Sequence, residues 1–316
     1  MGKIAFLFSG QGAQYPGMGQ ELAQTSPAAA DVFAMADRIR PGTSEQCFQG
    51  TKEELTITSN TQPDMFAVEL AAAAALVEAG VQPDALAGFS VGEVSALGFS
   101  GAVSREDAFR FVCRRGELMQ IASDEVSTGM CAVVKLSPEQ VEALCAQAEQ
   151  VYPVNYNSAA QTVCAGLSSS MAEFRASVKA AGGRAIPLKV AGAFHSPFMH
   201  SAAVGLREVL AELDFQAPQV PLYSNLTARP YEPEQFRELL SAQVENPVRW
   251  QAIVEHLAQS GVDTFIEVGP GATLTGLVKR ILPDAVALNV ENAETLKAAI
   301  AHLKAAAGTE AENRGK

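Results

Sequence analysis

The chain has 316 residues, of which 48% are hydrophobic and 18% are charged. This composition excludes an intrinsically disordered chain and fits one large α/β domain, or a large domain with a smaller partner. The formal net charge of −12 disfavours binding to nucleic acid or to anionic lipid. No apolar stretch reaches the length of a membrane span, so neither nucleic acid nor a membrane is expected as a partner.

The first apolar run, residues 4–8, is too short for a signal peptide and predicts a buried parallel strand. The glycine-rich loop that follows it fails the dinucleotide-binding pattern, because Tyr15 stands where the third glycine would be. We interpret this loop as a turn that places an amide side chain near a site. An alanine-rich helix is predicted from Pro63 to Ala79.

The sequence Gly88-Phe89-Ser90-Val91-Gly92 has the G-x-S-x-G pattern. A short strand is predicted before it, over residues 84–89, and a helix after it, from Glu93 onward. A strand-to-helix corner of this kind is a nucleophile elbow, with Ser90 at its tip. The backbone N–H groups at the start of the helix would then face an oxyanion. The pattern alone is more often an ordinary glycine-rich turn, and the surrounding sequence favours the nucleophile.

A helix is predicted over residues 104–121, where Ser104 and Asp107 resemble a capping box. Helical spacing puts Arg115 on the same face as Ala108, Val112 and Met119. A buried guanidinium needs a partner, because an unpaired buried charge costs roughly several kcal/mol. Either an internal carboxylate or a substrate carboxylate could supply that partner.

Residues 125–190 show a different order of predicted strands and helices from the rest of the chain. They predict the order βαββαβ, which is the ferredoxin-like arrangement. We therefore expect a ferredoxin-like subdomain over 125–190, inserted into a discontinuous core made of 1–124 and 191–308. The polar tail, 309–316, is expected to be disordered.

Among the four histidines, His195 lies in a glycine-containing loop just before a helix predicted to start at Pro197. Such a residue is either a presented catalytic base or a solvated side chain. The last third continues as α/β, with strands at 220–224, 264–268 and 286–288. The loop at 269–271 falls at the carboxyl edge of the sheet, where open α/β sheets place their sites.

The five cysteines are scattered, and no two of them form a C-x-x-C pair. A zinc site or a disulfide framework is therefore not expected, and no metal is predicted. This cysteine usage fits a reducing, cytoplasmic location.

Seven motifs, in this order, resemble the malonyl-CoA:acyl carrier protein transacylases of type II fatty acid synthesis. The resemblance covers about residues 3–300, and the combination is specific although each motif is weak alone. The motifs are Phe8-Ser9-Gly10-Gln11-Gly12-Ala13-Gln14, Gly88-Phe89-Ser90-Val91-Gly92-Glu93, Arg115-Gly116-Glu117-Leu118-Met119-Gln120, Asn155-Tyr156-Asn157-Ser158, Ala193-Phe194-His195-Ser196-Pro197, Asn246-Pro247-Val248-Arg249-Trp250 and Glu267-Val268-Gly269-Pro270-Gly271.

The resemblance implies an α/β fold with a hydrolase-like core, a mostly parallel sheet and the inserted ferredoxin-like subdomain. It implies that Ser90 attacks malonyl-CoA and that His195 carries the proton. The malonyl group would then pass, by a ping-pong route, to the phosphopantetheine thiol of acyl carrier protein. The backbone N–H groups of Gln11 and Val91 would form the oxyanion hole, and the backbone carbonyl of Arg249 would orient the histidine.

The resemblance also assigns substrate contacts. Arg115 would pair with the malonyl carboxylate, so an acetyl group would leave it unpaired. The bulk of Phe194 would disfavour a methylmalonyl chain, and Met119 and Asn157 would complete the substrate-binding set. No cofactor is implied, and we expect a monomer.

Two positions depart from the family pattern. Phe89 stands where the family usually has histidine, and Ser9 stands where it usually has proline. Neither residue carries the proton, so activity is expected to survive. The carrier is acidic, as this chain is, and local attraction would need basic residues near the cleft. The candidates are Arg184, Lys189, Lys279 and Arg280, although a solvated surface charge is the simpler explanation for any one of them.

Three rival interpretations stay open at this point. A serine thioesterase or lipase-like hydrolase shares the elbow but usually pairs its histidine with an acid. The malonyl transferase of a malonate decarboxylase would use the same chemistry in another pathway. A non-enzymatic protein on the same fold would gain no malonyl mass when it is mixed with malonyl-CoA.

Overall fold

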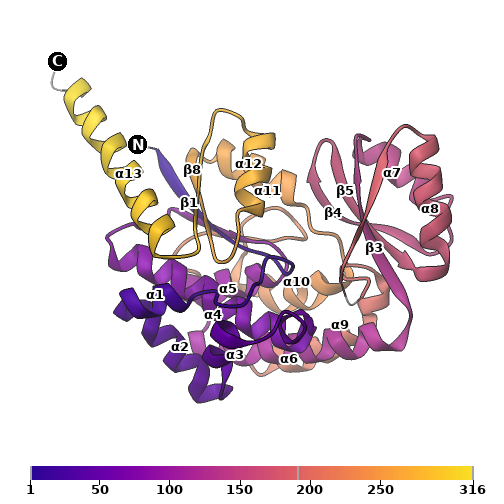
Figure 1. The fold of residues 1–316 in the computed structure, drawn as a ribbon, viewed down its shortest axis with the longest axis horizontal. Coiled ribbons are helices and arrows are strands. Elements are labelled where there is room, and N and C mark those ends of the chain that lie inside the picture. Colours follow the sequence, from indigo (N-terminus) through magenta and orange to yellow (C-terminus); the bar gives the residue numbers. More distant parts are fainter. Residues whose placement is uncertain (1, 191, 315–316) are drawn as a thin grey trace.

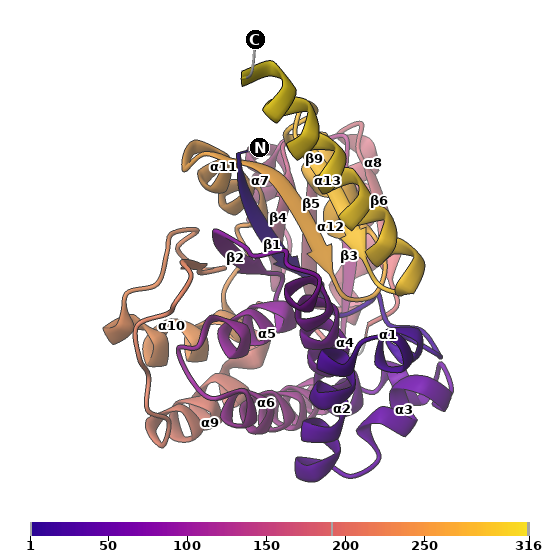
Figure 2. The same cartoon turned by 90° about the vertical axis from the view of Figure 1, so that its left-hand side faces the viewer.

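The core is built on a parallel sheet with the strand order β7-β2-β1-β8-β9 (Figures 1 and 2). The computed structural model describes residues 2–190 and 192–314. Its core strands are β1 (Lys3–Phe8), β2 (Ala85–Gly88), β7 (Leu222–Tyr223), β8 (Val262–Val268) and β9 (Val286–Val290).

Helices cover both faces of this sheet. The α-helices of the core are α1 (Gln20–Thr25), α2 (Pro27–Ile39), α3 (Thr43–Gln49), α4 (Thr58–Glu78), α5 (Val91–Ser100), α6 (Arg105–Glu125), α9 (His200–Ala211), α10 (Phe236–Ala242), α11 (Trp250–Gln259), α12 (Thr273–Ile281) and α13 (Ala293–Arg314). Short 3-10 turns are η1 (Glu54–Thr56), η2 (Pro197–Met199), η3 (Pro233–Gln235) and η4 (Gln243–Glu245).

Strand β1 shows why the core sheet is covered on both sides. Phe6 and Phe8 pack into the cluster that α2 and α4 share, whereas Ala5 and Leu7 pack on the opposite side, into the cluster that contains Trp250 of α11. Side chains of a strand alternate between its two faces, and both faces here are apolar. The predicted first strand is therefore confirmed as a buried parallel strand.

The small subdomain holds an antiparallel sheet with the order β4-β5-β3-β6. Its helices α7 and α8 cover the outer side of that sheet, away from the core (Figure 1). The order is the one that a ferredoxin-like βαββαβ unit produces, so the predicted fold class is confirmed. The elements are β3 (Thr128–Val134), α7 (Pro138–Cys145), β4 (Val151–Ser158), β5 (Gln161–Leu167), α8 (Ser168–Ala180) and β6 (Arg184–Leu188).

The parallel pairing places the carboxyl ends of β1, β2 and β8 at one edge of the core sheet. The small subdomain lies next to this edge (Figure 1). The contacts that join the parts there include a β-bridge and a side-chain hydrogen bond. Asn155 of β4 forms a bridge with Val248, and Arg280 of α12 donates a hydrogen bond of 3.1 Å from Nη1 to Gln161 Oε1 of β5.

Some predicted boundaries are wrong. Helix α4 begins at Thr58, so Pro63 lies inside it and does not open it. Helix α13 runs through Arg314 and includes most of the tail that was expected to be disordered, while residues 315–316 lie outside the described residues. Residue 191, at the expected domain boundary, also lies outside them. Within the described part of the chain, no helix combines the length and apolar character that a membrane span requires.

Candidate active site

The G-x-S-x-G segment forms a tight corner between β2 and α5. Ser90 has φ 57° and ψ −106°, a backbone conformation that non-glycine residues rarely adopt. A Cβ atom on Gly88 would lie 2.0 Å from the carbonyl carbon of Gly92, and a Cβ on Gly92 would lie 2.3 Å from the carbonyl oxygen of Phe8. Both glycines are therefore required sterically, as expected for a nucleophile elbow.

The imidazole of His195 contacts the hydroxyl at the tip of this corner. Its Nε2 atom lies 2.7 Å from Ser90 Oγ, and its Nδ1 atom lies 2.8 Å from the backbone carbonyl oxygen of Gln243. A carbonyl oxygen can only accept, so Nδ1 carries the proton and Nε2 is left to accept the proton of Ser90. The backbone N–H of His195 also donates to the backbone carbonyl of Val244 at 2.8 Å, which fixes the loop that carries the histidine.

Burial keeps this imidazole neutral. His195 is only 3% exposed. Burial, together with the positive charge of Arg115, lowers its pKa to about 4, although hydrogen bonds with backbone groups of Gln243 and Asn246 oppose the shift. A neutral imidazole is the form that can act as a general base.

The expected role of the Arg249 carbonyl is wrong, because the Gln243 carbonyl holds His195 instead. The Arg249 carbonyl accepts the N–H of Ile253 at 3.1 Å, at the start of α11. A helix-opening carbonyl is already committed to the first helical hydrogen bond. Gln243 begins η4, a short turn that the sequence analysis did not identify.

Arg115 projects from α6 beneath the same hydroxyl and is 1% exposed. Its Nη1 atom donates to Gln62 Oε1 at 2.7 Å, and its Nη2 atom donates to Gln243 Oε1 at 2.7 Å and to Ser90 Oγ at 3.4 Å. Its Nε atom has no hydrogen-bond partner within the part of the chain that the structure describes.

No carboxylate of the described residues lies within 4.0 Å of this guanidinium, so the structural salt bridge that the sequence left open is absent from that part of the chain. Burial lowers the pKa of Arg115 to about 10, and the nearby carboxylate of Glu93 opposes the shift. The group therefore stays charged at neutral pH, with amide oxygens as its partners. This arrangement can accept a further anion next to Ser90.

Other polar residues of the site were not predicted. Asn225, which follows β7, accepts the Ser90 N–H at 2.8 Å through Oδ1 and donates to the Gly88 carbonyl at 2.6 Å through Nδ2. Gln243 Nε2 donates to the Ser90 carbonyl at 2.9 Å. Both side chains approach Ser90 from the last third of the chain. Neither lies in a pattern that would single it out in the sequence.

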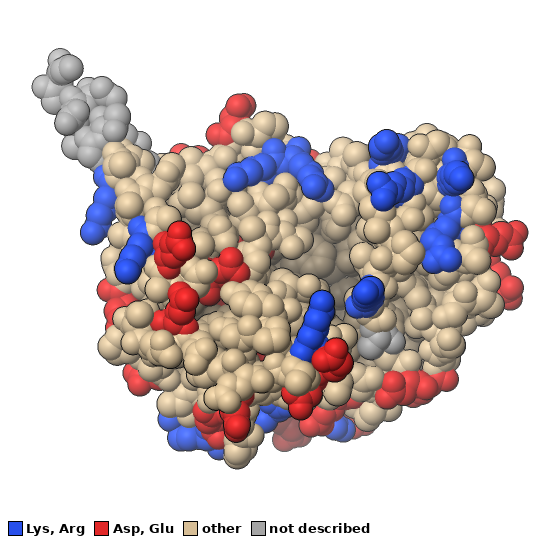
Figure 3. Space-filling view, in the orientation of Figure 1, with Lys and Arg blue, Asp and Glu red and all other residues tan. Residues whose placement is uncertain are grey.

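A cavity of about 240 Å³ adjoins the elbow and lies between the core and the small subdomain. Figure 3 shows the surface hollowed between α12 and the small subdomain. The Oδ1 atoms of Asn155 and Asn157, on β4, are buried and have no hydrogen-bond partner in residues 2–190 and 192–314. The cavity lining includes Gln11, Phe89, Asn155, Asn157, Val163, Leu188 and Leu274. It offers amide groups and an apolar wall to an extended ligand.

Of the four predicted site residues Gln11, Val91, Met119 and Phe194, only Gln11 lines this cavity. Gln11 lies in its wall, and neither the Gln11 N–H nor the Val91 N–H meets an acceptor among the described residues. Phe194 is buried directly before His195. Met119 is 1% exposed, and its Sδ atom accepts a hydrogen bond from Gln62 Nε2 at 3.3 Å. Met119 therefore shares Gln62 as a partner with Arg115 and does not belong to the cavity lining.

Phe89, the first of the two residues that depart from the family pattern, contributes an aromatic ring to the cavity wall. The Phe89 ring packs on Trp250 with a centroid distance of 5.4 Å and lines the cavity. A histidine here would bring a polar ring into an apolar contact. The second departure, Ser9, donates its hydroxyl to the Val268 carbonyl at 3.0 Å and so joins β1 to β8.

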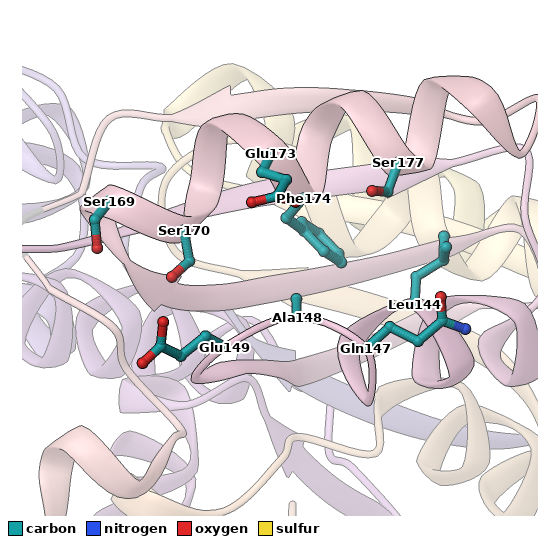
Figure 4. A pocket seen from close by; sticks show the side chains of 9 residues that line it. All are labelled: Leu144, Gln147, Ala148, Glu149, Ser169, Ser170, Glu173, Phe174 and Ser177. Carbon is teal, nitrogen blue, oxygen red and sulfur yellow. The ribbon is translucent and has the colours of Figure 1, made fainter.

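A second cavity, of about 320 Å³, lies on the small subdomain between α8 and the loop after α7 (Figure 4). Its lining holds Glu149, Glu173 and several serines, and none of the residues around Ser90 contributes to it. Among the described residues, no group of His, Cys, Asp or Glu side chains could hold a metal ion. The nucleophile Ser90, the base His195 and the cation Arg115 therefore meet at the elbow and not at this second cavity.

Comparison with known proteins agrees with this geometry. The acyl transferase domain family matches residues 5–308. The malonyl CoA-acyl carrier protein transacylase of Bacillus subtilis (strain 168) is 39% identical over 311 residues, covering 96% of this chain and 98% of that protein. The enzyme of the same name from Escherichia coli (strain K12) is 37% identical over 311 residues, covering 95% and 99%.

Solved structures are equally similar. The malonyl CoA-acyl carrier protein transacylase of Clostridium perfringens superposes with a TM-score of 0.94 at 35% identity, covering 98% of this chain and 99% of that one. A malonyl-transacylase solved with its type II PKS acyl-carrier protein has a TM-score of 0.91 at 36% identity, covering 95% and 99%. The chain therefore belongs to the acyl transferase family, among the malonyl CoA-acyl carrier protein transacylases.

Proposed function

We propose that this enzyme transfers the malonyl group of malonyl-CoA to the phosphopantetheine thiol of acyl carrier protein, and so supplies fatty acid synthesis. The observation that carries the proposal is a three-residue cluster. Ser90 Oγ lies 2.7 Å from His195 Nε2 and 3.4 Å from Arg115 Nη2. This cluster supplies a nucleophile, a base and a cation for a carboxylate in one place.

In the first half-reaction, Ser90 Oγ attacks the thioester carbonyl carbon while its proton moves to His195 Nε2. The N–H groups of Gln11 and Val91 would stabilise the negative charge on the carbonyl oxygen. The carbon–sulfur bond then breaks, and His195 returns the proton to the departing CoA sulfur. The product is a malonyl-serine ester and free CoA.

In the second half-reaction, His195 takes the proton of the carrier's phosphopantetheine thiol, and the thiolate attacks the malonyl-serine ester. The ester carbon–oxygen bond breaks, and the proton goes to Ser90 Oγ. The free enzyme is regenerated and the malonyl group is left as a thioester on the carrier. Both half-reactions use only groups of this chain and the two thiol carriers, so we propose that no cofactor takes part.

Arg115 is proposed to hold the far end of the acyl group. A malonyl carboxylate would meet a buried guanidinium that is free of any direct carboxylate partner in the described structure. An acetyl group has no charge to offer it, so selectivity follows from the cost of leaving buried donors unmatched. Phe194, beside His195, would limit room for a branched chain, and Asn157 would face the pantetheine arm in the cavity.

The proposed carrier is acidic, and this chain has a net charge of −12, so docking requires a local positive surface. Figure 3 shows Lys and Arg side chains over α12 and on the small subdomain, on either side of the hollow. Arg184, Lys189, Lys279 and Arg280 belong to these regions of the chain. Each of the five cysteines in the described chain is a free thiol, which supports the proposal of a cytoplasmic location.

Intact-protein mass spectrometry tests the proposal. Wild-type protein mixed with malonyl-CoA should gain one malonyl group and lose it when holo-acyl carrier protein is added, with an equal gain on the carrier. The variant Ser90→Ala should gain nothing. A wild-type protein that stays unmodified would contradict the proposal. Release of free malonate at the same rate with and without carrier would instead indicate a hydrolase.

A further inference from the structure

Glu93 is a buried carboxylate directly below the nucleophile. It lies in the first turn of α5 and is 0% exposed. The Asn225 N–H donates to its Oε1 atom at 2.9 Å, and the Tyr231 hydroxyl donates to the same atom at 2.6 Å. Gln243 Nε2 donates to its Oε2 atom. Every partner is a donor, which is the set that suits the ionised form of a carboxyl group. Burial raises the pKa of Glu93 to about 7, and these donors oppose the shift.

The side-chain amide of Gln243 joins this carboxylate to Arg115. Its Nε2 atom donates to Glu93, and its Oε1 atom accepts from Arg115 Nη2 at 2.7 Å. An amide has a donor end and an acceptor end, and the carboxylate can bind only the donor end. The carboxylate therefore decides that the oxygen of Gln243 faces the guanidinium.

We propose that Glu93 is a positioning residue for malonyl selectivity: it fixes the direction of the Gln243 amide and thereby the place of Arg115. This inference rests on the proposed function, because it concerns how the cation that would bind the malonyl carboxylate is held. A direct Glu93–Arg115 ion pair would occupy the guanidinium. With the amide between them, the Glu93 charge offsets that of Arg115 without direct contact, and Arg115 Nε has no hydrogen-bond partner among the described residues.

A second branch of the same network holds the nucleophile itself. Asn225, bound to Glu93, also accepts the Ser90 N–H at 2.8 Å. Gln243 Nε2 also donates to the Ser90 carbonyl at 2.9 Å. Loss of this branch would slow acylation by any acyl group. Loss of the Arg115 branch would slow malonyl transfer alone, so the two contributions separate experimentally.

The test compares kcat/KM for malonyl-CoA and acetyl-CoA in wild type, Glu93→Gln, Gln243→Met and Tyr231→Phe. The amide in Glu93→Gln brings a donor against the donors of its neighbours, so the Gln243 amide must turn or lose its partner. We expect the malonyl-over-acetyl ratio to fall at least tenfold in Glu93→Gln, mainly through a higher KM for malonyl-CoA. Tyr231→Phe, which keeps the carboxylate and its contact with Gln243, should stay within threefold of wild type.

Gln243→Met keeps the backbone carbonyl that holds His195 and removes the side-chain amide, which bridges Glu93 to Arg115 and also donates to the Ser90 carbonyl. Gln243→Met should show the same loss of malonyl selectivity. If circular dichroism shows that Glu93→Gln is unfolded, Gln243→Met alone tests the inference. The inference is wrong if a folded Glu93→Gln or Gln243→Met protein keeps its malonyl preference within threefold, or if both acyl groups slow equally. A wild-type protein that forms no malonyl-enzyme would overturn the proposed function instead, before any variant is compared.

Discussion

At the scale of single residues, the site depends on two ionisable groups that are kept in unusual places. His195 is a buried neutral imidazole, and Arg115 is a buried cation without a direct carboxylate partner in the described structure. Each disfavours a positive charge on the other. The arrangement becomes useful when an anionic substrate arrives, because its carboxylate offsets the charge that burial disfavours.

The first prediction concerns the pH dependence of acylation by malonyl-CoA. Only neutral His195 can accept the Ser90 proton, and its pKa is lowered to about 4. At saturating malonyl-CoA, where a change in KM caused by protonation of Glu93 has no effect, the rate should therefore stay level as the pH falls below about 6.5, the ordinary pKa of histidine. It should drop only near the lowered pKa of His195. Rapid-mixing measurements of malonyl-enzyme formation check this. A midpoint near 6.5 in a protein that circular dichroism shows to be folded would contradict it.

The second prediction concerns Arg115→Ala. Malonyl-CoA should lose at least roughly tenfold in kcat/KM, the loss expected when a charged hydrogen bond is removed, while acetyl-CoA should lose much less. Because Arg115 lowers the pKa of His195, the acidic limb of the pH profile should also move upward. Competition between the two thioesters provides the measurement.

Arg114→Ala is the matched control for this variant. Arg114 is the neighbouring residue on α6, and its exposed guanidinium pairs with Glu117 at 2.7 Å. Its removal should leave both selectivity and the pH profile unchanged. Equal malonyl preference in Arg115→Ala and Arg114→Ala would refute the role proposed for Arg115.

At the scale of elements, the corner between β2 and α5 tolerates no added atom. The third prediction is that Gly92→Ala destabilises the protein by about 3 kcal/mol and abolishes malonyl-enzyme formation, because its Cβ would lie 2.3 Å from the Phe8 carbonyl oxygen. Gly276→Ala is the control, since a Cβ at that position in α12 meets no atom of the described residues within 4 Å. That change should be neutral or stabilising by about 1 kcal/mol. Urea unfolding measures both, and equal stabilities would refute the prediction.

The same elements show what the sequence predicts and what it does not. Ser90 was predictable because its pattern is local. The arginine was predictable because helical spacing reveals a charge on an apolar face. The start of α4 was not, because Thr58 is held by a distant partner, Gln120, whose Oε1 accepts its N–H at 3.0 Å. That contact favours a helical turn ahead of Pro63, where local rules predict the beginning.

The polar network failed prediction for the same reason. Glu93, Asn225 and Gln243 meet across separations of 132 and 150 residues between Glu93 and the other two. No local periodicity encodes such a contact. Likewise, the resemblance identified a backbone carbonyl as the partner of His195 but placed it at Arg249, where α11 already uses it. Which carbonyl reaches the imidazole depends on the path of η4.

At the scale of the whole molecule, buried carboxyl groups tie stability to pH. Arg40, at the end of α2, donates to Gln46 of α3 at 2.8 Å and to Asn60 of α4 at 2.9 Å, and it lies 3.5 Å from the buried Asp64 carboxylate. Burial raises the pKa of Asp64 to about 7, although Arg40 opposes the shift. The folded protein therefore binds more protons here than the unfolded chain does.

The fourth prediction follows from that difference. The Asp64 contribution to stability is fully present below the unfolded pKa, about 3.9, and is lost as the pH rises through the folded value. Asp64→Asn removes this titration. The other buried carboxyl groups are present in both proteins, so their contributions cancel when the two are compared. The variant should gain stability relative to wild type by on the order of 3 kcal/mol between pH 4 and 8. Denaturant midpoints at several pH values measure it, and parallel curves would contradict it.

Ser90 and His195 both have positive φ angles, a backbone conformation that favours glycine. Ser90 has φ 57° and His195 has φ 63°, and each such conformation costs an L-residue about 1–3 kcal/mol. Glycine would relieve that strain at either position while it deletes the hydroxyl or the imidazole. Directed evolution that selects only for heat resistance should therefore enrich glycine at positions 90 and 195. The resulting proteins would be stable but inactive. Any thermostabilisation campaign on this enzyme needs a turnover screen alongside it.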